Sequence, residues 1–287
     1  MYSAVDLHTH TTASDGVLAP RELVAVALDR GLRALGITDH DSTEGLREAI
    51  EAARGTPLEV VPGVEIGTDV PRSEVHILGY YFDLHHRQFQ ETLFAMRDAR
   101  VGRARRMVEK LAGLGVPIEW ERVQELAGAG AVGRPHIAQA MLEKGYVKTM
   151  PEAFALYLGR NGPAYVDRFK VTPEEAVELI CRAGGVAVLA HPIIVTPGDD
   201  LGEKLPLDDL LPRLARAGLV GIEAYYLGYT LEMTAEITRL ADQHGLITTG
   251  GSDYHGRGGY TADVGEIVVP LESYTKLKAL AGGRQTR

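Results

Sequence analysis

Short apolar runs alternate with stretches of helical periodicity along most of the chain. The apolar runs are bounded by Gly, Pro and polar residues, a pattern that is typical of buried strands. They predict strands at residues 4–7, 32–38, 58–66, 74–82, 186–190, 219–224 and 246–249, and a strand-like piece at 264–269. The periodic stretches predict helices at 20–30, 44–54, 173–183, 207–217 and 231–244, with a final helix near the C-terminus.

The alternation is interrupted between residues 83 and 168. A long helical stretch at 85–114 is followed by shorter ones at 119–127, 135–144 and 151–158, and no strand pattern separates them. We therefore predict one domain formed by residues 1–82 and 169–287, and a helical insertion at 83–168 that acts as a substrate cap.

Strands that are each followed by a helix predict an α/β fold with parallel strands and helices outside. Seven such strands suggest a closed or nearly closed barrel with one unit fewer than the usual eight. A doubly wound open sheet is the alternative. In a barrel of this kind, reactive residues lie at the C-terminal ends of the strands.

Composition narrows the class of protein. The chain has 287 residues and 45% apolar content, enough for a sizeable core. No stretch has the length of a membrane span, and the N-terminus lacks the layout of a signal peptide, so we expect a soluble cytoplasmic protein. The net charge of -9 argues against a general nucleic-acid coat. The single cysteine, Cys181, sits in an apolar helical pattern and is expected to fill the core.

Metal-ligating residue types gather at the strand ends. His8 and His10 are two positions apart in an extended segment, so both side chains point to the same side and can bind one cation. Asp15 follows five residues later, and His76 lies inside the fourth predicted strand. The other candidates at strand ends are His40, Glu65, His191, Asp253 and His255.

Imidazoles that converge at one rim would repel one another as cations and would lose hydration as neutral, unpaired groups. Divalent ions satisfy them all at once. A mixture of nitrogen and carboxylate ligands suits zinc, manganese or iron better than calcium or magnesium. The alternative is that each residue is a separate structural hydrogen-bonding group in a polar loop. Nine ligands are too many for one ion.

Together these segments resemble the motif set of the PHP family, named for polymerase and histidinol phosphatase. The segments are Asp6-Leu7-His8-Thr9-His10, Ser14-Asp15-Gly16, Thr38-Asp39-His40-Asp41, Pro62-Gly63-Val64-Glu65, His76, Ala190-His191-Pro192 and Gly251-Ser252-Asp253-Tyr254-His255. Within the family, Thr38-Asp39-His40-Asp41 and Gly133-Arg134-Pro135-His136 resemble the branch of small phosphoesterases that act on nucleotides. That branch includes 3',5'-nucleoside bisphosphate phosphatase and the 5'-to-3' exoribonuclease RNase AM.

The resemblance implies a distorted (β/α)7 barrel that holds three divalent ions, manganese foremost, with iron or zinc as alternatives. The implied ligand sets are His8, His10, Glu65 and Asp253 for one ion, Glu65, His76 and His191 for the second, and Asp15, His40 and His255 for the third. Glu65, His191 and Asp253 are the implied catalytic residues. Glu223 also lies at a strand end, but it matches no family ligand position and is left outside the predicted site.

Substrate contacts are expected from the insertion. Arg134 lies just before a predicted helix start, where a guanidinium and free backbone N–H groups can face one phosphate. An ordinary surface arginine is the alternative. His136 lies beside it, and Arg160 and Asn161, in a Gly-flanked turn, are further candidates. Arg168 and Lys170, where the chain rejoins the barrel, are similar candidates for substrate contacts. Tyr225 and Tyr226 fit packing as well as base stacking.

A run of basic residues follows one helical stretch of the insertion. The run consists of Arg97, Arg100, Arg103, Arg105, Arg106 and Lys110. Such runs usually form a solvated helix face. The functional alternative is that these residues form a track that binds the phosphates of a short RNA.

These expectations define a metal-dependent phosphoesterase. We expect it to remove the 3'-phosphate from nucleoside 3',5'-bisphosphates, with 5'-to-3' exonuclease action on short RNA as a further activity. Its expected partner is a phosphorylated nucleotide or short oligoribonucleotide, and the sequence indicates no membrane and no stable protein partner. The alternatives are a histidinol-phosphate phosphatase and, from another class, a metal-stabilised binding module without catalysis.

Overall fold

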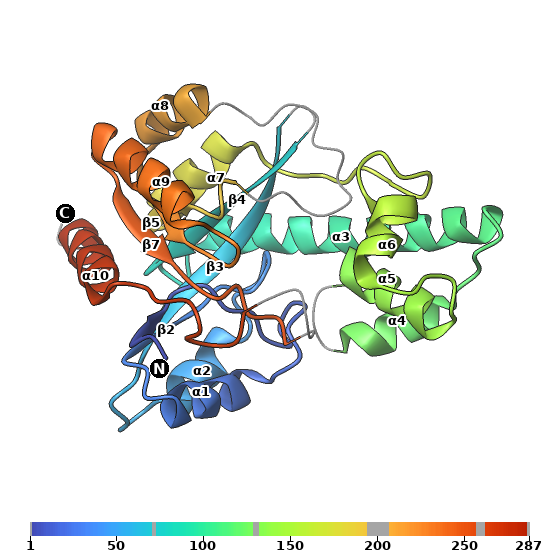
Figure 1. Ribbon diagram of the computed structural model, residues 1–287, viewed down its shortest axis with the longest axis horizontal. Helices are drawn as coiled ribbons and strands as arrows, with labels where there is room; N and C mark the ends of the chain where they lie inside the picture. The colour runs from blue at the N-terminus through green and yellow to red at the C-terminus, as the bar shows by residue number, and fades with distance from the viewer. Residues whose placement is uncertain (1, 71–72, 129–131, 194–206, 257–261, 286–287) are drawn as a thin grey trace.

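Seven strands form one nearly closed barrel in the computed structural model, which describes residues 2–70, 73–128, 132–193, 207–256 and 262–285 (Figure 1). The strands, in sheet order, are β1 (Val5–Asp6), β2 (Ala34–Ile37), β3 (Glu59–Val70), β4 (Ser73–Tyr80), β5 (Val186–Leu189), β6 (Leu219–Tyr225) and β7 (Ile247–Gly250). The two ends of the sheet meet, because the N–H of Leu7 donates to the carbonyl of Gly250 at 3.2 Å and Thr9 pairs with Tyr254. This closure confirms the barrel and rules out the open sheet.

The prediction that all strands are parallel is wrong for β4. This strand runs antiparallel to both β3 and β5, because β3 and β4 follow one another without an intervening helix. Its beginning therefore lies at the rim where the parallel strands end. That direction explains why His76 lies inside its strand, where it pairs with Gly67 and its carbonyl accepts the N–H of Ala190 at 3.0 Å.

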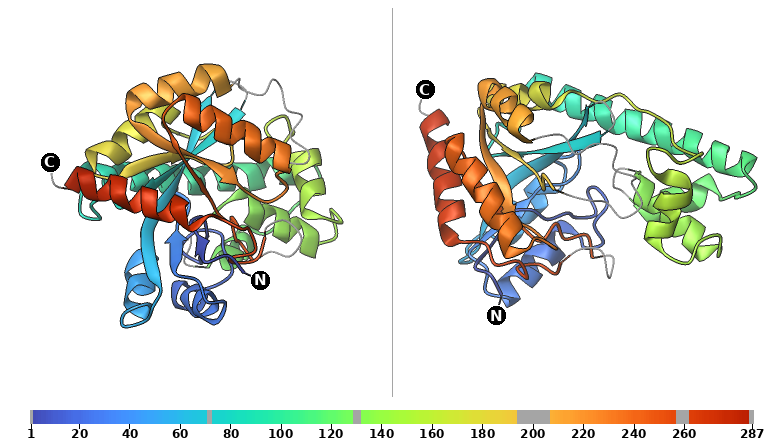
Figure 2. Two further views of the ribbon diagram at one scale, coloured as in Figure 1. Left: turned by 60° about the vertical axis from the view of Figure 1, so that its left-hand side comes forward. Right: turned by 45° about the horizontal axis from the view of Figure 1, so that its top comes forward.

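In the described part of the chain, helices lie around the barrel and across one of its ends (Figure 2). They are α1 (Pro20–Asp29), α2 (Leu46–Ala52), α7 (Pro173–Arg182), α8 (Leu207–Ala217), α9 (Leu231–Gln243) and α10 (Leu271–Gln285). The strand β5 shows how the core is divided: Ala187 and Leu189 join the cluster under the outer helices, whereas Val186 and Val188 join an inner cluster with Leu277 of α10. The helix α10 thus closes the barrel at the end away from the insertion.

The strand-like piece predicted at 264–269 is not a strand. Two of its N–H groups donate to side chains, that of Gly265 to Asp6 Oδ2 at 2.8 Å and that of Val269 to Ser3 Oγ at 3.2 Å. The carbonyl of Gly265 accepts the backbone N–H of Ser3 at 2.7 Å. Val264 and Val269 are buried, whereas Val268 is 72% exposed. A ladder does not form because contacts between the β1 and β7 ends already close the sheet and leave it no free edge.

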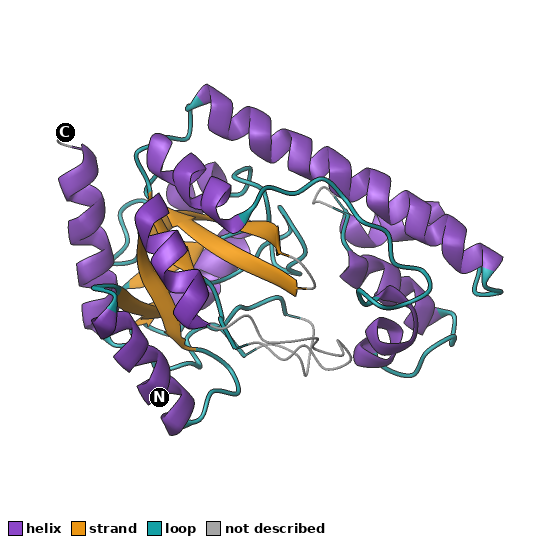
Figure 3. Cartoon of the chain, turned by 90° about the horizontal axis from the view of Figure 1, so that it is seen from above, coloured by secondary structure: helices purple, strands orange, loops and turns teal. Residues whose placement is uncertain are grey.

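The insertion is helical and is built on one long helix (Figure 3). Its elements are α3 (Arg87–Gly113), α4 (Trp120–Ala127), α5 (Arg134–Glu143), α6 (Met150–Ala153) and the π-helix η1 (Phe154–Leu158). The first half of α3 packs on the barrel core through Phe89 and Met96, and its second half packs in a separate insertion core through Met107 and Leu111. The division at residue 83 stays a prediction, because α3 belongs to both cores.

No helix in the described ranges combines the length and the apolar composition that crossing a bilayer requires.

Candidate metal centre

The nine predicted ligands come together at one end of the barrel. Strand β1 and the segment after it deliver His8, His10 and Asp15, the loop after β2 delivers His40, β3 and β4 deliver Glu65 and His76, the end of β5 delivers His191, and the end of β7 delivers Asp253 and His255. Parallel strands end at a common rim, so residues far apart in sequence meet there.

Glu65 is the centre of the cluster. Its carboxylate is buried and has imidazole nitrogens around both oxygens. Those near Oε1 are Nδ1 of His76 at 2.7 Å and Nε2 of His191 at 3.0 Å, and those near Oε2 are Nδ1 of His40 at 3.0 Å, Nε2 of His10 at 3.2 Å and Nε2 of His8 at 3.4 Å. One carboxylate therefore faces groups on two sides, which is the arrangement that a bridging ligand needs.

The candidate ligand atoms form three groups, and within each group all the atoms lie within 4.8 Å of one another. They are His8, His10, Glu65 and Asp253; His10, Asp15, His40 and His255; and His40, Glu65 and His76. The first group equals an implied ligand set, and the second contains another. The third includes His40 where the resemblance implies His191, although His191 also reaches Glu65. The assignment of each ligand to an ion stays a prediction.

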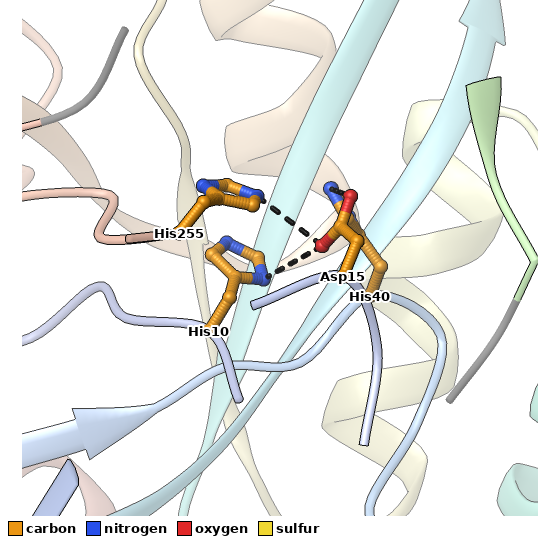
Figure 4. Close-up of side chains that lie close together, drawn as sticks. All are labelled: His10, Asp15, His40 and His255. Atoms are coloured by element: carbon orange, nitrogen blue, oxygen red, sulfur yellow. Dashed lines mark ion pairs between the residues drawn. The ribbon is translucent and has the colours of Figure 1, made fainter. Parts of the chain in front are cut away.

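Asp15 lies beside His10, His40 and His255 at the rim (Figure 4). It is part of a turn in which the N–H groups of Ser14 and Gly16 donate to the carbonyl of Thr11. Oδ1 of Asp15 lies 3.2 Å from Nε2 of His255 and 3.8 Å from Nδ1 of His10. Gly16 makes the turn possible, because a Cβ there would lie 2.4 Å from the carbonyl oxygen of His10. The carboxylate of Asp39 fixes the same turn by accepting the Ser14 hydroxyl at 2.6 Å.

Burial and mutual charge set the ionisation of the cluster. Burial alone raises the pKa of Glu65, but the surrounding imidazoles, His40 foremost, hold that pKa well below its usual range. Burial alone lowers the pKa of His10, but the carboxylates of Asp253 and Glu65 raise it to about 10. The carboxylates therefore stay ionised and require positive charge beside them. Divalent ions would supply that charge in place of imidazole protons.

The donor set fits metal ions. Oε2 of Glu65 and Oδ1 of Asp253 are buried, and neither accepts a hydrogen bond of ordinary geometry within the described part of the chain. Imidazole nitrogens nevertheless lie close to both, such as Nε2 of His10 at 3.0 Å from Asp253 Oδ1. Buried carboxylate oxygens in a shell of nitrogen atoms are costly without a cation and are good ligands for one.

The backbone is strained where it presents two of these side chains. His191 has a φ of 21° and Asp253 a φ of 50°, both in the region that L-residues rarely adopt. Such conformations cost about 1–3 kcal/mol each and persist where the surroundings hold them. At Asp253, the N–H donates to the carbonyl of His8 at 2.8 Å and ties the ends of β7 and β1 together.

Two residues at the end of β6 contact the cluster although neither was predicted to. Glu223 is fully buried, and its Oε2 lies 3.1 Å from Nδ1 of His8. The hydroxyl of Tyr226 donates to Oδ2 of Asp253 at 2.7 Å. The sequence did carry a sign of the first contact, because Glu223 stands at a strand end like the ligands. Nothing in the sequence separated Tyr226 from a packing residue.

The basic run on α3 forms neither a fully solvated face nor an open track. Arg100 and Arg103 are buried, at 8% and 3% exposure. Arg106 and Lys110 are exposed, but they donate to the carbonyls of Asp167 and Tyr165 and so hold the chain that returns to the barrel.

The predicted substrate contacts lie in the insertion. Arg134 is the first residue of α5, and its Cζ lies 5.6 Å from the ring centre of Phe154. His136 is buried, and its Nδ1 accepts the N–H of Gly133 at 3.0 Å, which completes the first turn of the helix. Arg160 and Asn161 lie in the turn after η1, with Asn161 exposed. Their roles toward a substrate stay predictions.

Comparison with known proteins agrees with this geometry. The family profile of the PHP domain matches residues 6–158. The 5'-3' exoribonuclease Rnm of Salmonella typhimurium is 37% identical over 252 residues, which cover 87% of this chain and 84% of that protein. The 3',5'-nucleoside bisphosphate phosphatase of Chromobacterium violaceum is 35% identical over 279 residues, which cover 93% of this chain and 94% of that protein.

A solved structure is similar over almost the whole chain. It is a metal-dependent phosphoesterase from Bifidobacterium adolescentis, with a TM-score of 0.87 and 32% identity over 96% of this chain and 95% of that one. The likeness therefore includes the insertion as well as the barrel. The chain belongs to the PHP domain family of metal-dependent phosphoesterases.

Proposed function

We propose that this protein hydrolyses the 3'-phosphate of nucleoside 3',5'-bisphosphates and also acts as a 5'-to-3' exonuclease on short RNA. The observation that carries the proposal is the gathering of all nine candidate ligand side chains, Glu65 included, at one rim. The substrate class comes from the two curated relatives, whose names specify a nucleoside bisphosphate and RNA. Both reactions break a phosphate ester, so one centre can serve both.

The proposed cofactor is a group of three divalent ions, with manganese preferred and iron or zinc as alternatives. Imidazole and carboxylate ligands suit these metals. When bound, such ions lower the pKa of coordinated water and neutralise charge on phosphoryl oxygens. The proposed ligands are the nine residues of the rim, with Glu65 between two ions.

In this proposal three residues hold and orient positive charge beside the reacting phosphate. Glu65 sets the spacing of the positive charges through its two oxygens, which face different imidazoles. His191 and Asp253 border the centre from the ends of β5 and β7, with side chains 12% and 13% exposed at the mouth. Three other candidate ligands, His40, His76 and His255, have side chains 13%, 20% and 16% exposed, so a phosphate group can reach the mouth of the centre.

The substrate's other phosphate would be held by the insertion. Arg134 carries a guanidinium at the first turn of α5, where the positive end of the helix dipole also favours an anion. Arg160 and Asn161, in the turn after η1, are the other proposed contacts, with His136 supporting the turn that carries Arg134.

A direct assay tests the proposal. The purified protein is incubated with manganese and with adenosine 3',5'-bisphosphate, a 5'-phosphorylated oligoribonucleotide or histidinol phosphate. We expect phosphate release from the bisphosphate and shortening of the oligonucleotide. We expect both activities to be lost in His8→Ala and Asp253→Asn. Turnover of histidinol phosphate alone, or no turnover of any of the three, would refute the proposed function.

A further inference from the structure

Among the described strands, β6 is the only one that supplies none of the nine predicted ligands. Its end nevertheless lies at the same rim, between the end of β5 that carries His191 and the end of β7 that carries Asp253. Two residues there, Glu223 and Tyr226, touch predicted ligands from three other strands. The end of β6 therefore has a place in the centre that the ligand list does not explain.

Glu223 contacts the Nδ1 side of the His8 ring. The Oε2 atom of this fully buried carboxylate lies 3.1 Å from Nδ1 of His8 and also accepts the backbone N–H of His191 at 2.9 Å. A proton on Nδ1 leaves Nε2 with a lone pair. That Nε2 lies 3.4 Å from Oε2 of Glu65 and 3.3 Å from Oδ1 of Asp253, among the other candidate ligand atoms.

Glu223 also contributes to the strained backbone at the end of β5. His191 has a φ of 21°, and its N–H points at the Glu223 carboxylate. A single oxygen thus fixes a side chain from β1 and a main-chain group from β5. Its effect is to hold two ligands in one orientation relative to each other.

Tyr226 determines which oxygen of Asp253 faces the cluster. Its hydroxyl donates to Oδ2 at 2.7 Å, so Oδ1 is the oxygen left for the cluster. Oδ1 lies 3.0 Å from Nε2 of His10 and 3.3 Å from Nε2 of His8. The centre of the Tyr226 ring lies 5.4 Å from that of the His191 ring.

We propose that Glu223 and Tyr226 are positioning residues for the metal centre: Glu223 directs Nε2 of His8, and Tyr226 directs Oδ1 of Asp253, toward one bound cation. The inference rests on the proposed metal-dependent function, but it concerns affinity and geometry rather than the substrate. Partners that orient ligands in this way typically change metal affinity by about 10- to 100-fold when they are removed.

The variants separate positioning from packing. Tyr226→Phe keeps the ring and removes the hydroxyl. Glu223→Gln keeps an acceptor oxygen, whereas Glu223→Ala removes it. Two matched controls lie away from the rim: Tyr274→Phe removes another phenol that donates to a carboxylate, at 2.5 Å from Glu59, and Glu59→Gln alters that carboxylate.

The decisive measurement is the manganese dissociation constant, obtained by competition with a chelator. It is accompanied by the absorption spectrum of the cobalt-substituted protein and by the melting temperature. We expect about tenfold weaker binding of one ion in Tyr226→Phe, an equal or larger loss in Glu223→Ala, a smaller loss in Glu223→Gln and a changed cobalt spectrum. At saturating manganese, turnover by Tyr226→Phe should recover to within a few-fold of wild type. Both controls should bind manganese as the wild type does.

Unchanged manganese affinity and cobalt spectra in Tyr226→Phe and Glu223→Ala would overturn the inference, even if the melting temperature fell. A wild-type protein that binds no manganese, cobalt or zinc would overturn it as well. A wild type that binds ions but does not cleave nucleotides would refute the proposed function alone, because the differences in affinity among the variants would still stand.

Discussion

Nε of Arg100 lies 2.7 Å from Oδ2 of Asp41, so α3 is bound to the residue that follows His40. Arg168 reaches the same oxygen at 3.3 Å from the other end of the insertion. The second oxygen of Asp41 accepts the N–H of Gly67 at 3.1 Å. Burial raises the pKa of Asp41, but the two guanidinium groups outweigh burial and lower it to about 2. One buried carboxylate therefore ties both ends of the insertion to the metal-binding rim.

Asp41→Asn should destabilise the fold strongly, because it leaves Arg100 and Arg168 buried beside a neutral group. Removing one partner of a buried ion pair costs about 3–5 kcal/mol. Urea unfolding of the metal-free protein measures the loss. The control is Glu44→Gln, which removes the partner of Arg97 on the same helix; Glu44 is 61% exposed, so its loss should stay below about 1 kcal/mol. Equal losses in both variants would refute the role assigned to Asp41.

Removal of metal should lower both activity and stability. An ion that binds only the folded state stabilises it by about 2.7 kcal/mol at one hundred times its dissociation constant. We expect chelation with EDTA to abolish turnover and to lower the melting temperature, and added manganese to restore both. Asp253→Asn, which lacks a proposed ligand, should show a smaller rise in melting temperature on manganese addition. An equal rise in both proteins would show that Asp253 does not bind the stabilising ion.

Arg134→Ala should raise KM for a nucleoside 3',5'-bisphosphate much more than it lowers kcat. A charge-assisted bond to phosphate is worth about 1.5–3 kcal/mol, which corresponds to roughly a 10- to 150-fold change in KM. Arg134→Lys should recover part of the loss, because it keeps the charge but not the planar pair of donors. Steady-state kinetics with varied bisphosphate provide the measurement.

The control for Arg134 is Arg105→Ala. The Cζ of Arg105 lies 5.3 Å from the ring centre of Trp120, and that of Arg134 lies 5.6 Å from the ring centre of Phe154, so both variants lose a stacked guanidinium from the insertion. We expect Arg105→Ala to leave KM near the wild-type value. A similar rise in KM in both variants would assign the effect to the stability of the insertion instead of to phosphate binding.

The stability that Glu59 contributes at neutral pH should be lost in acid. Burial raises the pKa of Glu59, but hydrogen bonds from Lys278, Tyr274 and Tyr81 outweigh burial and lower it below its usual value. A depressed carboxyl pKa contributes stability above the unfolded-state pKa, and this contribution disappears as the pH falls through the folded-state value. The stability difference between wild type and Glu59→Gln should therefore shrink from pH 7 toward pH 3. A difference that is independent of pH would contradict this account.

Much of the site could be predicted because the residue types at the strand ends can be read directly from the sequence. His8 and His10 share one side of an extended segment, and the C-terminal ends of parallel strands share one rim. The prediction that nine side chains gather there agrees with the structure, while their roles as metal ligands stay predictions. It needed only the positions of the strands and the direction in which most of them run.

The burial of the arginines on α3 illustrates what local pattern missed. Arg100 and Arg103 are buried on the same helix as the core residues Met107 and Leu111. Periodicity shows that these residues share a face, but it does not show what covers that face. Arg100 meets segments far from it in sequence on both sides, because its Nε lies beside Asp41 and Arg168 reaches the same carboxylate oxygen.

The sequence by itself determined the order of most strands and helices, the α/β class and the chemical identity of the nine ligand candidates, because these follow from composition and periodicity along the chain. Tertiary structure decided the direction of β4, the contacts of Asp41 with Arg100 and Arg168, and the contacts of Glu223 and Tyr226. The physical reason is that a hydrogen bond depends on two atoms meeting at about 3 Å. Glu223 and His8 are 215 positions apart, and only the closure of the barrel brings their atoms within that distance.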